Sequence, residues 1–150
     1  MKNYWLILFI CLGSLANAQT TNDADKILGL WQVGSGKARI KITKYGDKFG
    51  GKIVWLRDSL NDKGERKVDK NNPDKTKKTL PLIGLNNLLG FTYKEKGKYS
   101  GGTIYDPENG STYNCVINLE DQNNLKVRGY IGIQLIGRTD VWKRVNETQK

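Results

Sequence analysis

The feature that most constrains the fold of this chain is a repeated pattern of short segments in which apolar and polar residues alternate. Ala38, Ile40 and Ile42 alternate with Arg39, Lys41 and Thr43. A period of two residues is typical of a strand with one buried face. Comparable segments, bounded by Gly, Asn and Asp residues, lie at 28–33, 38–43, 49–56, 88–93, 101–105, 113–119, 125–131 and 136–145. The sequence therefore predicts about eight short strands.

The strands are joined mostly by segments of hairpin length, so neighbours in sequence are expected to pair antiparallel. An open sheet of this kind leaves two unpaired edges, and closure into a barrel removes them. Helix signals are confined to residues 21–28, where Asn22 or Asp23 is a suitable N-cap. We predict an all-β fold: a single antiparallel up-and-down β-barrel with a short N-terminal helical turn and a long loop after the third strand.

The segment between the predicted strands at 101–105 and 111–119 is rich in Asp, Asn, Pro and Gly. Such a composition is found both in ligand-binding loops and in simple turns. Pro107 fixes one backbone angle, Gly110 supplies a positive φ, and Asp106 with Glu108 offers too few ligands for calcium. The segment is predicted to be a hairpin turn, with structural roles for Asp106, Pro107 and Gly110.

Residues 57–80 form the long loop. Between Lys63 and Lys78 this loop contains seven basic and three acidic residues. Its length is typical of a lid, a binding loop or a disordered connection. Two interpretations stay open: a solvated loop, or a lid that binds an anion through Lys75, Lys77 and Lys78.

The N-terminus has the pattern of a signal peptide. Lys2 precedes an apolar run too short to span a bilayer as a mature helix, and Ala-Asn-Ala at 16–18 predicts cleavage before Gln19. The bulky Ile10 before Cys11 argues against lipid attachment. The expected organisation is a signal peptide at 1–18, an N-terminal segment at 19–27, a barrel domain at 28–145 and a C-terminal tail at 146–150. A periplasmic or secreted protein without a transmembrane segment is expected.

Composition restricts the chemistry of the mature chain. The sequence has no His, and after removal of Cys11 only Cys115 remains, in a strand pattern that predicts a buried thiol. Histidine-based triads, imidazole zinc sites and thiolate clusters are therefore excluded, and we expect no metal or cofactor. Subtracting Lys2 from the net charge of +10 leaves +9, because residues 1–18 contain no acid. Anionic partners such as lipid headgroups or envelope glycans are favoured over nucleic acid.

Several blocks of residues, in order along the chain, resemble the bacterial exported family called domain of unknown function 2147. They are Gly-Leu-Trp at 29–31, Gly-Gly-Lys-Ile-Val-Trp at 50–55, Asp-Lys-Gly at 62–64 with Asp69 and Asn72-Pro73, Pro-Leu-Ile-Gly at 81–84, Gly-Gly-Thr-Ile-Tyr-Asp-Pro at 101–107, Leu-Lys-Val-Arg-Gly-Tyr at 125–130 and Gly-Arg-Thr-Asp-Val-Trp at 137–142. The resemblance covers about residues 28–145. It implies a secreted single-domain β protein and leaves the biochemical role open.

A looser resemblance links the chain to lipocalin and fatty-acid-binding barrels. In those barrels a Gly-x-Trp motif on the first strand packs under an arginine near the chain end. Here Gly29 and Trp31 form the motif, and Arg138 or Arg144 is the expected partner. The cation–π contact would contribute about 1 kcal/mol and fix strand register. Its expected role is structural.

The first functional hypothesis is a carrier of a small or lipidic, and in one version anionic, ligand. An eight-stranded barrel is either filled by side chains or holds one small molecule. The aromatic residues expected to line its interior or mouth, or simply to fill its core, are Trp55, Tyr105, Tyr113, Tyr130 and Trp142.

Two alternatives belong to other classes. One is a non-catalytic protein of the envelope that docks on anionic surfaces through the basic loop. The other is an enzyme that uses Asp69, Asp106 or Glu108 as acid and base, although nothing in their spacing supports that geometry. We expect no catalytic constellation. The sequence does not indicate the ligand or the oligomeric state.

Overall fold

The computed structural model of the chain describes residues 22–146. The predicted signal peptide, with its cleavage site before Gln19, and residues 147–150 of the predicted tail lie outside this range. The elements are η1 (Asp23–Ile27), β1 (Gly29–Gln32), β2 (Ala38–Tyr45), β3 (Lys48–Leu56), η2 (Lys75–Lys77), β4 (Asn86–Tyr93), β5 (Lys98–Asp106), β6 (Ser111–Asp121), β7 (Asn124–Tyr130) and β8 (Gly137–Val145). Between residues 22 and 146 no helix is long and apolar enough to cross a lipid bilayer.

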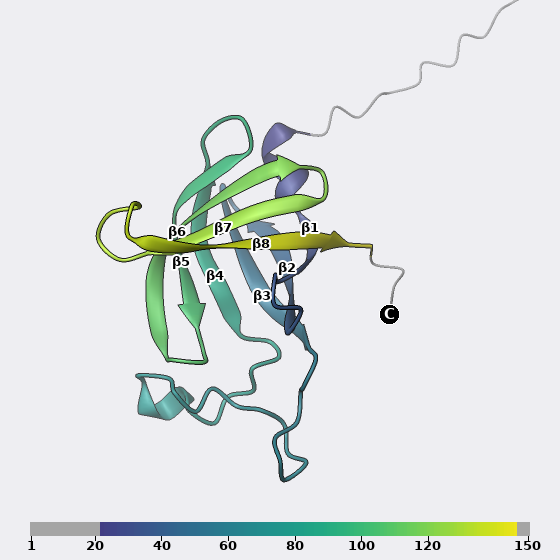
Figure 1. Cartoon of the computed structure of the whole chain (residues 1–150), viewed down its shortest axis with the longest axis vertical. Helices are drawn as coiled ribbons and strands as arrows, with labels where there is room; N and C mark the ends of the chain where they lie inside the picture. Colours follow the sequence, from purple (N-terminus) through teal and green to yellow (C-terminus); the bar gives the residue numbers. More distant parts are fainter. Residues whose placement is uncertain (1–21, 147–150) are drawn as a thin grey trace, which may run out of the picture.

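The eight strands form one closed barrel in which each strand pairs antiparallel with the next and β8 pairs with β1. The predicted all-β up-and-down barrel is confirmed, with its short helical turn before β1 and its long loop after β3. Figure 1 shows η1 at one end of the barrel and the long loop beyond the other end, beside the turn between β5 and β6. The β7–β8 hairpin protrudes from the side.

The core occupies the half of the barrel next to η1. Residues opposite one another in adjacent antiparallel strands share a face, and Trp31 is opposite Ile40, which is opposite Ile53. Each of these side chains is buried. The other buried members of this inner face and of the η1 plug are Ala24, Ile27, Ile42, Phe49, Leu88, Phe91, Tyr99, Cys115, Ile117, Leu125, Val127 and Trp142.

Trp31 and Arg144 close the seam between the first and last strands. They are paired residues of β1 and β8, and the Arg144 guanidinium lies 4.1 Å from the centre of the Trp31 ring. Trp31 Nε1 donates to the Ile27 carbonyl at 2.9 Å, and Arg144 donates to the carbonyls of Leu28 at 2.7 Å and Lys26 at 2.6 Å. Of the two arginines expected from the sequence, Arg144 is therefore the partner of Trp31.

Gly29 is required at this seam. Its φ is +129°, and a Cβ there would lie 2.8 Å from Arg144 Nη1. Burial lowers the pKa of Arg144 from its usual value, yet a guanidinium remains charged at any physiological pH. Carbonyl oxygens and the indole face stabilise the cation, and these contacts fix β8 to β1.

Candidate functional site

The residues on the inner face become more exposed toward the end of the barrel opposite η1. The buried Leu88 is opposite Ile104, which is opposite Tyr113, and the buried Cys115 is opposite Gly129, which is opposite Arg138. These positions share the inner face, yet Ile104, Tyr113 and Gly129 are only partly buried and Arg138 is exposed. We call the set formed by Ile104, Tyr113, Gly129, Arg138 and Asp140 the open half of the inner face.

Three inner-face glycines show how the space differs between the two halves. A Cβ on Gly51 would lie 2.7 Å from Ile40 Cγ2, and one on Gly102 would lie 2.6 Å from Phe91 Cδ2. At Gly129 the nearest atoms are Ile104 Cγ2 at 3.4 Å and Tyr113 Cβ at 3.6 Å, which are ordinary contacts. A Cβ therefore fits at Gly129 in ordinary contact with Ile104 and Tyr113, whereas it would clash at the two glycines near the core.

Asp140 is a polar residue of the open half, and two hydrogen bonds hold its side chain in place. It is opposite the buried Val127, and its Oδ2 accepts hydrogen bonds from Trp142 Nε1 at 2.8 Å and from the Gly34 amide at 3.1 Å. Arg138, two residues earlier on the same face, forms no salt bridge with a carboxylate among residues 22–146. The guanidinium of Arg138 is thus the positive group that the open half can offer to an anion.

Asn87 is a buried polar residue on β4, outside the set that forms the open half. The register of β3 and β4 shifts so that Asn87 is an extra residue between Asn86 and Leu88. It is 7% exposed, and its Oδ1 has no hydrogen-bond partner among the described residues. A buried amide oxygen without a partner is costly, and such groups often mark sites where a ligand or water binds.

The long loop after β3 is held in a defined conformation by hydrogen bonds within the loop and to the barrel. Asp69 is fully buried, and its two carboxylate oxygens accept hydrogen bonds from Tyr105 Oη at 2.8 Å and from Asn72 Nδ2 at 2.6 Å. The Asp69 amide donates to the carbonyl of Leu80 at 2.9 Å, and Val68 forms a β-bridge with Pro81. The loop is therefore tied both to itself and to the outer face of β5.

The loop also docks on the turn between β5 and β6. Asn71 Nδ2 donates to the carbonyls of Pro107 at 3.2 Å and Glu108 at 2.8 Å. Gly110 has a φ of +72°, and a Cβ there would lie 2.0 Å from the Asn71 carbonyl oxygen. Burial, with the hydrogen bond to Asp69, raises the pKa of Tyr105 to about 12. The long loop thus docks on this turn. Glycine is required at position 110 both by its positive φ and by the close approach of Asn71 from the loop.

The five aromatic residues proposed from the sequence as pocket lining do not come together. Trp55 lies on the outer face opposite Arg39, whose guanidinium is 4.7 Å from its ring, and Tyr105 and Tyr130 also face outward. A bulge in β3 between the positions of Ile53 and Trp55 sets the side on which Trp55 lies. Trp142 is on the inner face but is packed in the core, and Tyr113 is the one of the five in the open half.

The carboxylates considered for acid–base chemistry each have a structural partner. Asp69 binds Tyr105 and Asn72, Asp106 accepts the Glu108 amide at 2.9 Å, and Glu108 forms a salt bridge with Lys37 at 3.2 Å. The basic residues Lys75, Lys77 and Lys78 are exposed on or next to η2, away from the open half, and Lys77 pairs with Asp74 at 3.3 Å. Burial raises the pKa of the Cys115 thiol to about 12, in agreement with the predicted inert cysteine.

Sequence reasoning missed Ile104, Gly129 and Asp140 as members of the site, and it did not single out the buried Asn87. Arg138 was considered only as a structural partner of Trp31. The strand register, which places Gly129 opposite Arg138, was the signal needed, and it depends on bulges that the alternation pattern does not reveal.

The closed eight-stranded barrel with its Trp–Arg seam is a lipocalin-like fold. The structure is similar to that of protein HP1028 from the human pathogen Helicobacter pylori, which is described as belonging to the lipocalin family; the TM-score is 0.72, with 21% identity over 81% of this chain and 84% of that chain. No curated protein matches the chain. Residues 29–144 match the family described as "Uncharacterized protein conserved in bacteria (DUF2147)", and the chain belongs to this family.

Proposed function

We propose that this protein binds a small amphipathic anion, such as a lipidic carboxylate, in the open half of its inner face. The observation that carries the proposal is the contrast between the inner-face glycines, together with the exposure of the residues around Gly129: a Cβ fits at Gly129 but clashes at Gly51 and Gly102. The lipocalin-like fold supports the assignment, because barrels of this size hold at most one small ligand. The signal-peptide pattern adds the periplasm or the exterior as the place of action.

The chemistry of the open half matches such a ligand. Ile104 and the ring of Tyr113 offer an apolar surface, and Arg138 offers a planar cation suited to a carboxylate or phosphate. Asp140 already accepts two hydrogen bonds, and its negative charge stands on the same face two residues from Arg138. An anionic head near Arg138 with its apolar part toward Ile104 is the arrangement that satisfies these groups.

The proposal is tested by blocking the space without disturbing the core. Gly129→Leu places a side chain between Ile104 and Tyr113, and Asn114→Leu is the matched control, because Asn114 is exposed on the outer face of the neighbouring strand. Dodecanoate binding, measured by calorimetry, should weaken at least about tenfold in Gly129→Leu and stay unchanged in Asn114→Leu. Arg138→Gln should remove the preference for dodecanoate over dodecanol. Equal dodecanoate binding by Gly129→Leu and the parent would contradict the proposal that the ligand binds in the open half.

A second candidate function is docking on an anionic envelope surface through the basic loop. The observation in its favour is that the Asp69 hydrogen bonds hold the loop in place while Lys75, Lys77 and Lys78 stay exposed. Reversal of these three lysines to Glu should then abolish retention on immobilised anionic glycan, with the thermal midpoint unchanged. Retention that survives the reversal would remove this candidate and leave the binding site in the barrel untouched.

A further inference from the structure

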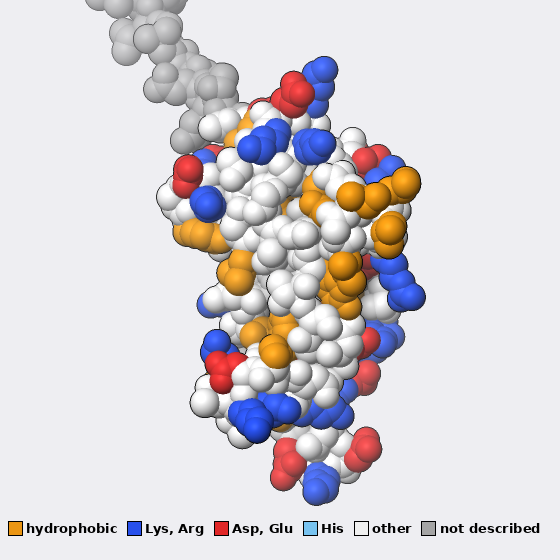
Figure 2. Space-filling model, turned by 90° about the vertical axis from the view of Figure 1, so that its left-hand side faces the viewer, with side chains coloured by type: hydrophobic (Ala, Val, Ile, Leu, Met, Phe, Trp, Pro, Cys, Tyr) orange, Lys and Arg blue, Asp and Glu red, His pale blue; other side chains and the backbone are white. Residues whose placement is uncertain are grey.

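The β7–β8 hairpin ends in an apolar tip, which we define as residues 131–136. The tip reads Ile-Gly-Ile-Gln-Leu-Ile, and its four aliphatic side chains are 69% (Ile131), 60% (Ile133), 84% (Leu135) and 67% (Ile136) exposed. Single exposed aliphatic residues are normal, but four within six residues indicate an interaction surface. The hairpin protrudes from the barrel in Figure 1, and Figure 2, which views the molecule from that side, shows several hydrophobic patches on this face, bordered by basic and acidic side chains.

The backbone of the apolar tip is held by hydrogen bonds from Arg128 and by two bonds within the turn. Arg128 donates from Nε to the Gln134 carbonyl at 2.8 Å, from Nη2 to the Leu135 carbonyl at 3.1 Å and from Nη1 to Thr139 Oγ1 at 2.8 Å. The carbonyl of Ile133 accepts the Ile136 amide at 3.1 Å, and that of Ile136 accepts the Ile131 amide at 3.4 Å. Four carbonyls of the tip, those of residues 133–136, thus have donors within the protein, and these bonds hold the shape of the turn. An interfacial position, in which the side chains enter the bilayer and the backbone stays near the headgroups, is compatible with this pattern.

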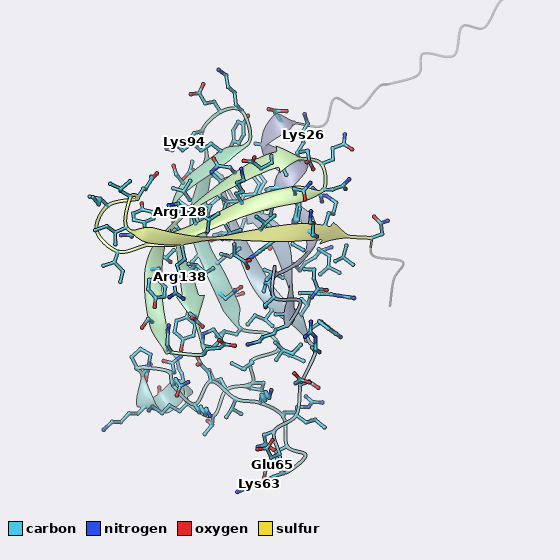
Figure 3. All side chains as sticks on the ribbon, in the orientation of Figure 1. Lys26, Lys63, Glu65, Lys94, Arg128 and Arg138 are labelled. Carbon is cyan, nitrogen blue, oxygen red and sulfur yellow. The ribbon has the colours of Figure 1, made fainter. Side chains whose placement is uncertain are left out.

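The charges around the apolar tip are mostly positive. Residues 126–140 contain Lys126, Arg128 and Arg138 against one acidic residue, Asp140. Figure 3 labels Arg128 and Arg138 on the two strands at the base of the hairpin. Aliphatic side chains at a protruding tip with cations at its base are the pattern of a segment that enters the boundary of an anionic bilayer.

We propose that the apolar tip docks this protein on the surface of an anionic lipid bilayer, with the aliphatic side chains of residues 131–136 entering the boundary between headgroups and acyl chains. The convex shape of the tip fits a deformable bilayer, whereas a protein partner would need a groove built to receive it. The flanking Arg138 and the Arg128 that fixes the turn add attraction to anionic headgroups. The proposal does not depend on whether the open half of the barrel binds a ligand.

The test is sedimentation of the purified, naturally processed protein with vesicles of phosphatidylethanolamine and phosphatidylglycerol, compared with vesicles of phosphatidylcholine alone. The double variant Ile133→Ser with Leu135→Ser removes two aliphatic side chains that are 60% and 84% exposed and lie outside the core. The matched control is Leu60→Ser with Ile83→Ser, which removes two exposed aliphatic side chains, at 51% and 46%, from the connection between β3 and β4 (residues 57–85). Thermal midpoints of both double variants are measured in parallel.

We expect the parent and the control to bind the anionic vesicles alike and the tip variant to bind at least about tenfold more weakly, as loss of the apolar transfer energy predicts. Leu135→Trp should add a blue-shifted emission component when vesicles are present. Equal binding by the tip variant and the parent would overturn the proposal, as would no binding by the parent. Self-association of the parent that the tip variant abolishes, without vesicle binding, would assign the tip to a second copy and overturn it as well.

Discussion

The two halves of the barrel interior are built from the same strands and yet behave differently. On β6, Cys115 is 1% exposed inside the core, and Tyr113, the preceding residue on the same face, is partly exposed in the open half. The core half contains the Trp31–Arg144 seam and the η1 plug, which fix the strand ends. Stability concentrated in one half allows the residues of the other half to stay partly exposed, as is common where a scaffold carries a functional site.

Replacement of Trp31 and of Trp55 should give the largest difference in the free energy of unfolding. Trp31→Ala should lower the free energy of unfolding by about 4 kcal/mol, because a fully buried indole and its bond to the Ile27 carbonyl are lost. Trp55→Ala should cost about 1 kcal/mol or less, since this indole is 36% exposed on the outer face. Urea unfolding of both variants measures the difference. Similar losses would show that the outer face contributes as much as the core.

Replacement of Arg144 and of Arg138 should give the next largest difference in stability. Arg144→Gln should cost about 3 kcal/mol, because the carbonyls of Leu28 and Lys26 lose their charged donor and Trp31 loses its cation. Arg138→Gln should change stability by less than about 0.5 kcal/mol, since Arg138 is exposed. Its effect should appear in anion binding instead. A large loss of stability in Arg138→Gln would mean that the open half is structural after all.

The third contrast is between the long loop and the barrel on which it docks. Tyr105→Phe leaves one oxygen of the buried Asp69 without a donor and should cost about 1 to 2 kcal/mol. Limited proteolysis should then cut the loop at 57–85 faster than in the parent, while the barrel remains intact.

The same bond predicts a pH dependence. The pKa of Tyr105 is raised in the fold from its ordinary value of 10.0 to about 12. The stabilisation is therefore complete below pH 10 and is lost as the pH rises toward 12. Proteolysis of the loop should accelerate over this window in the parent and not in Tyr105→Phe. A rate that is flat across the window in both proteins would show that Tyr105 does not hold the loop.

The fold could be predicted from the sequence because alternation, turn residues and the absence of helix signals all agree. Ile40 and Ile42 mark an inner face by local pattern alone, and the Gly-x-Trp motif gives the seam. Strand lengths were less accurate: β5 begins at Lys98, three residues before the predicted segment at 101–105. An irregularity between Tyr99 and Gly102 interrupts the alternation there, so the pattern hides the start of the strand.

The candidate site was much less predictable, for a physical reason. Whether an aromatic residue faces in or out depends on register, and one bulge moves the following side chains to the other face. That effect separates Trp55 from Ile53. Similarly, Asp69 and Tyr105 are 36 residues apart in sequence, and their hydrogen bond depends on how the loop folds back over the barrel. Local composition identified the loop as basic and did not indicate its anchor.

The account rests on the boundary between a filled and an open half of one inner face, and paired thiol labelling tests this boundary most directly. The native Cys115 is compared with a single cysteine at position 113, made by Tyr113→Cys together with Cys115→Ala, using a thiol reagent at fixed pH. We predict that Cys115 reacts only through global unfolding, because it is buried and its pKa is raised to about 12, whereas the thiol at 113 reacts nearly as fast as a free cysteine. Equal protection of the two thiols, at equal stability, would contradict the account.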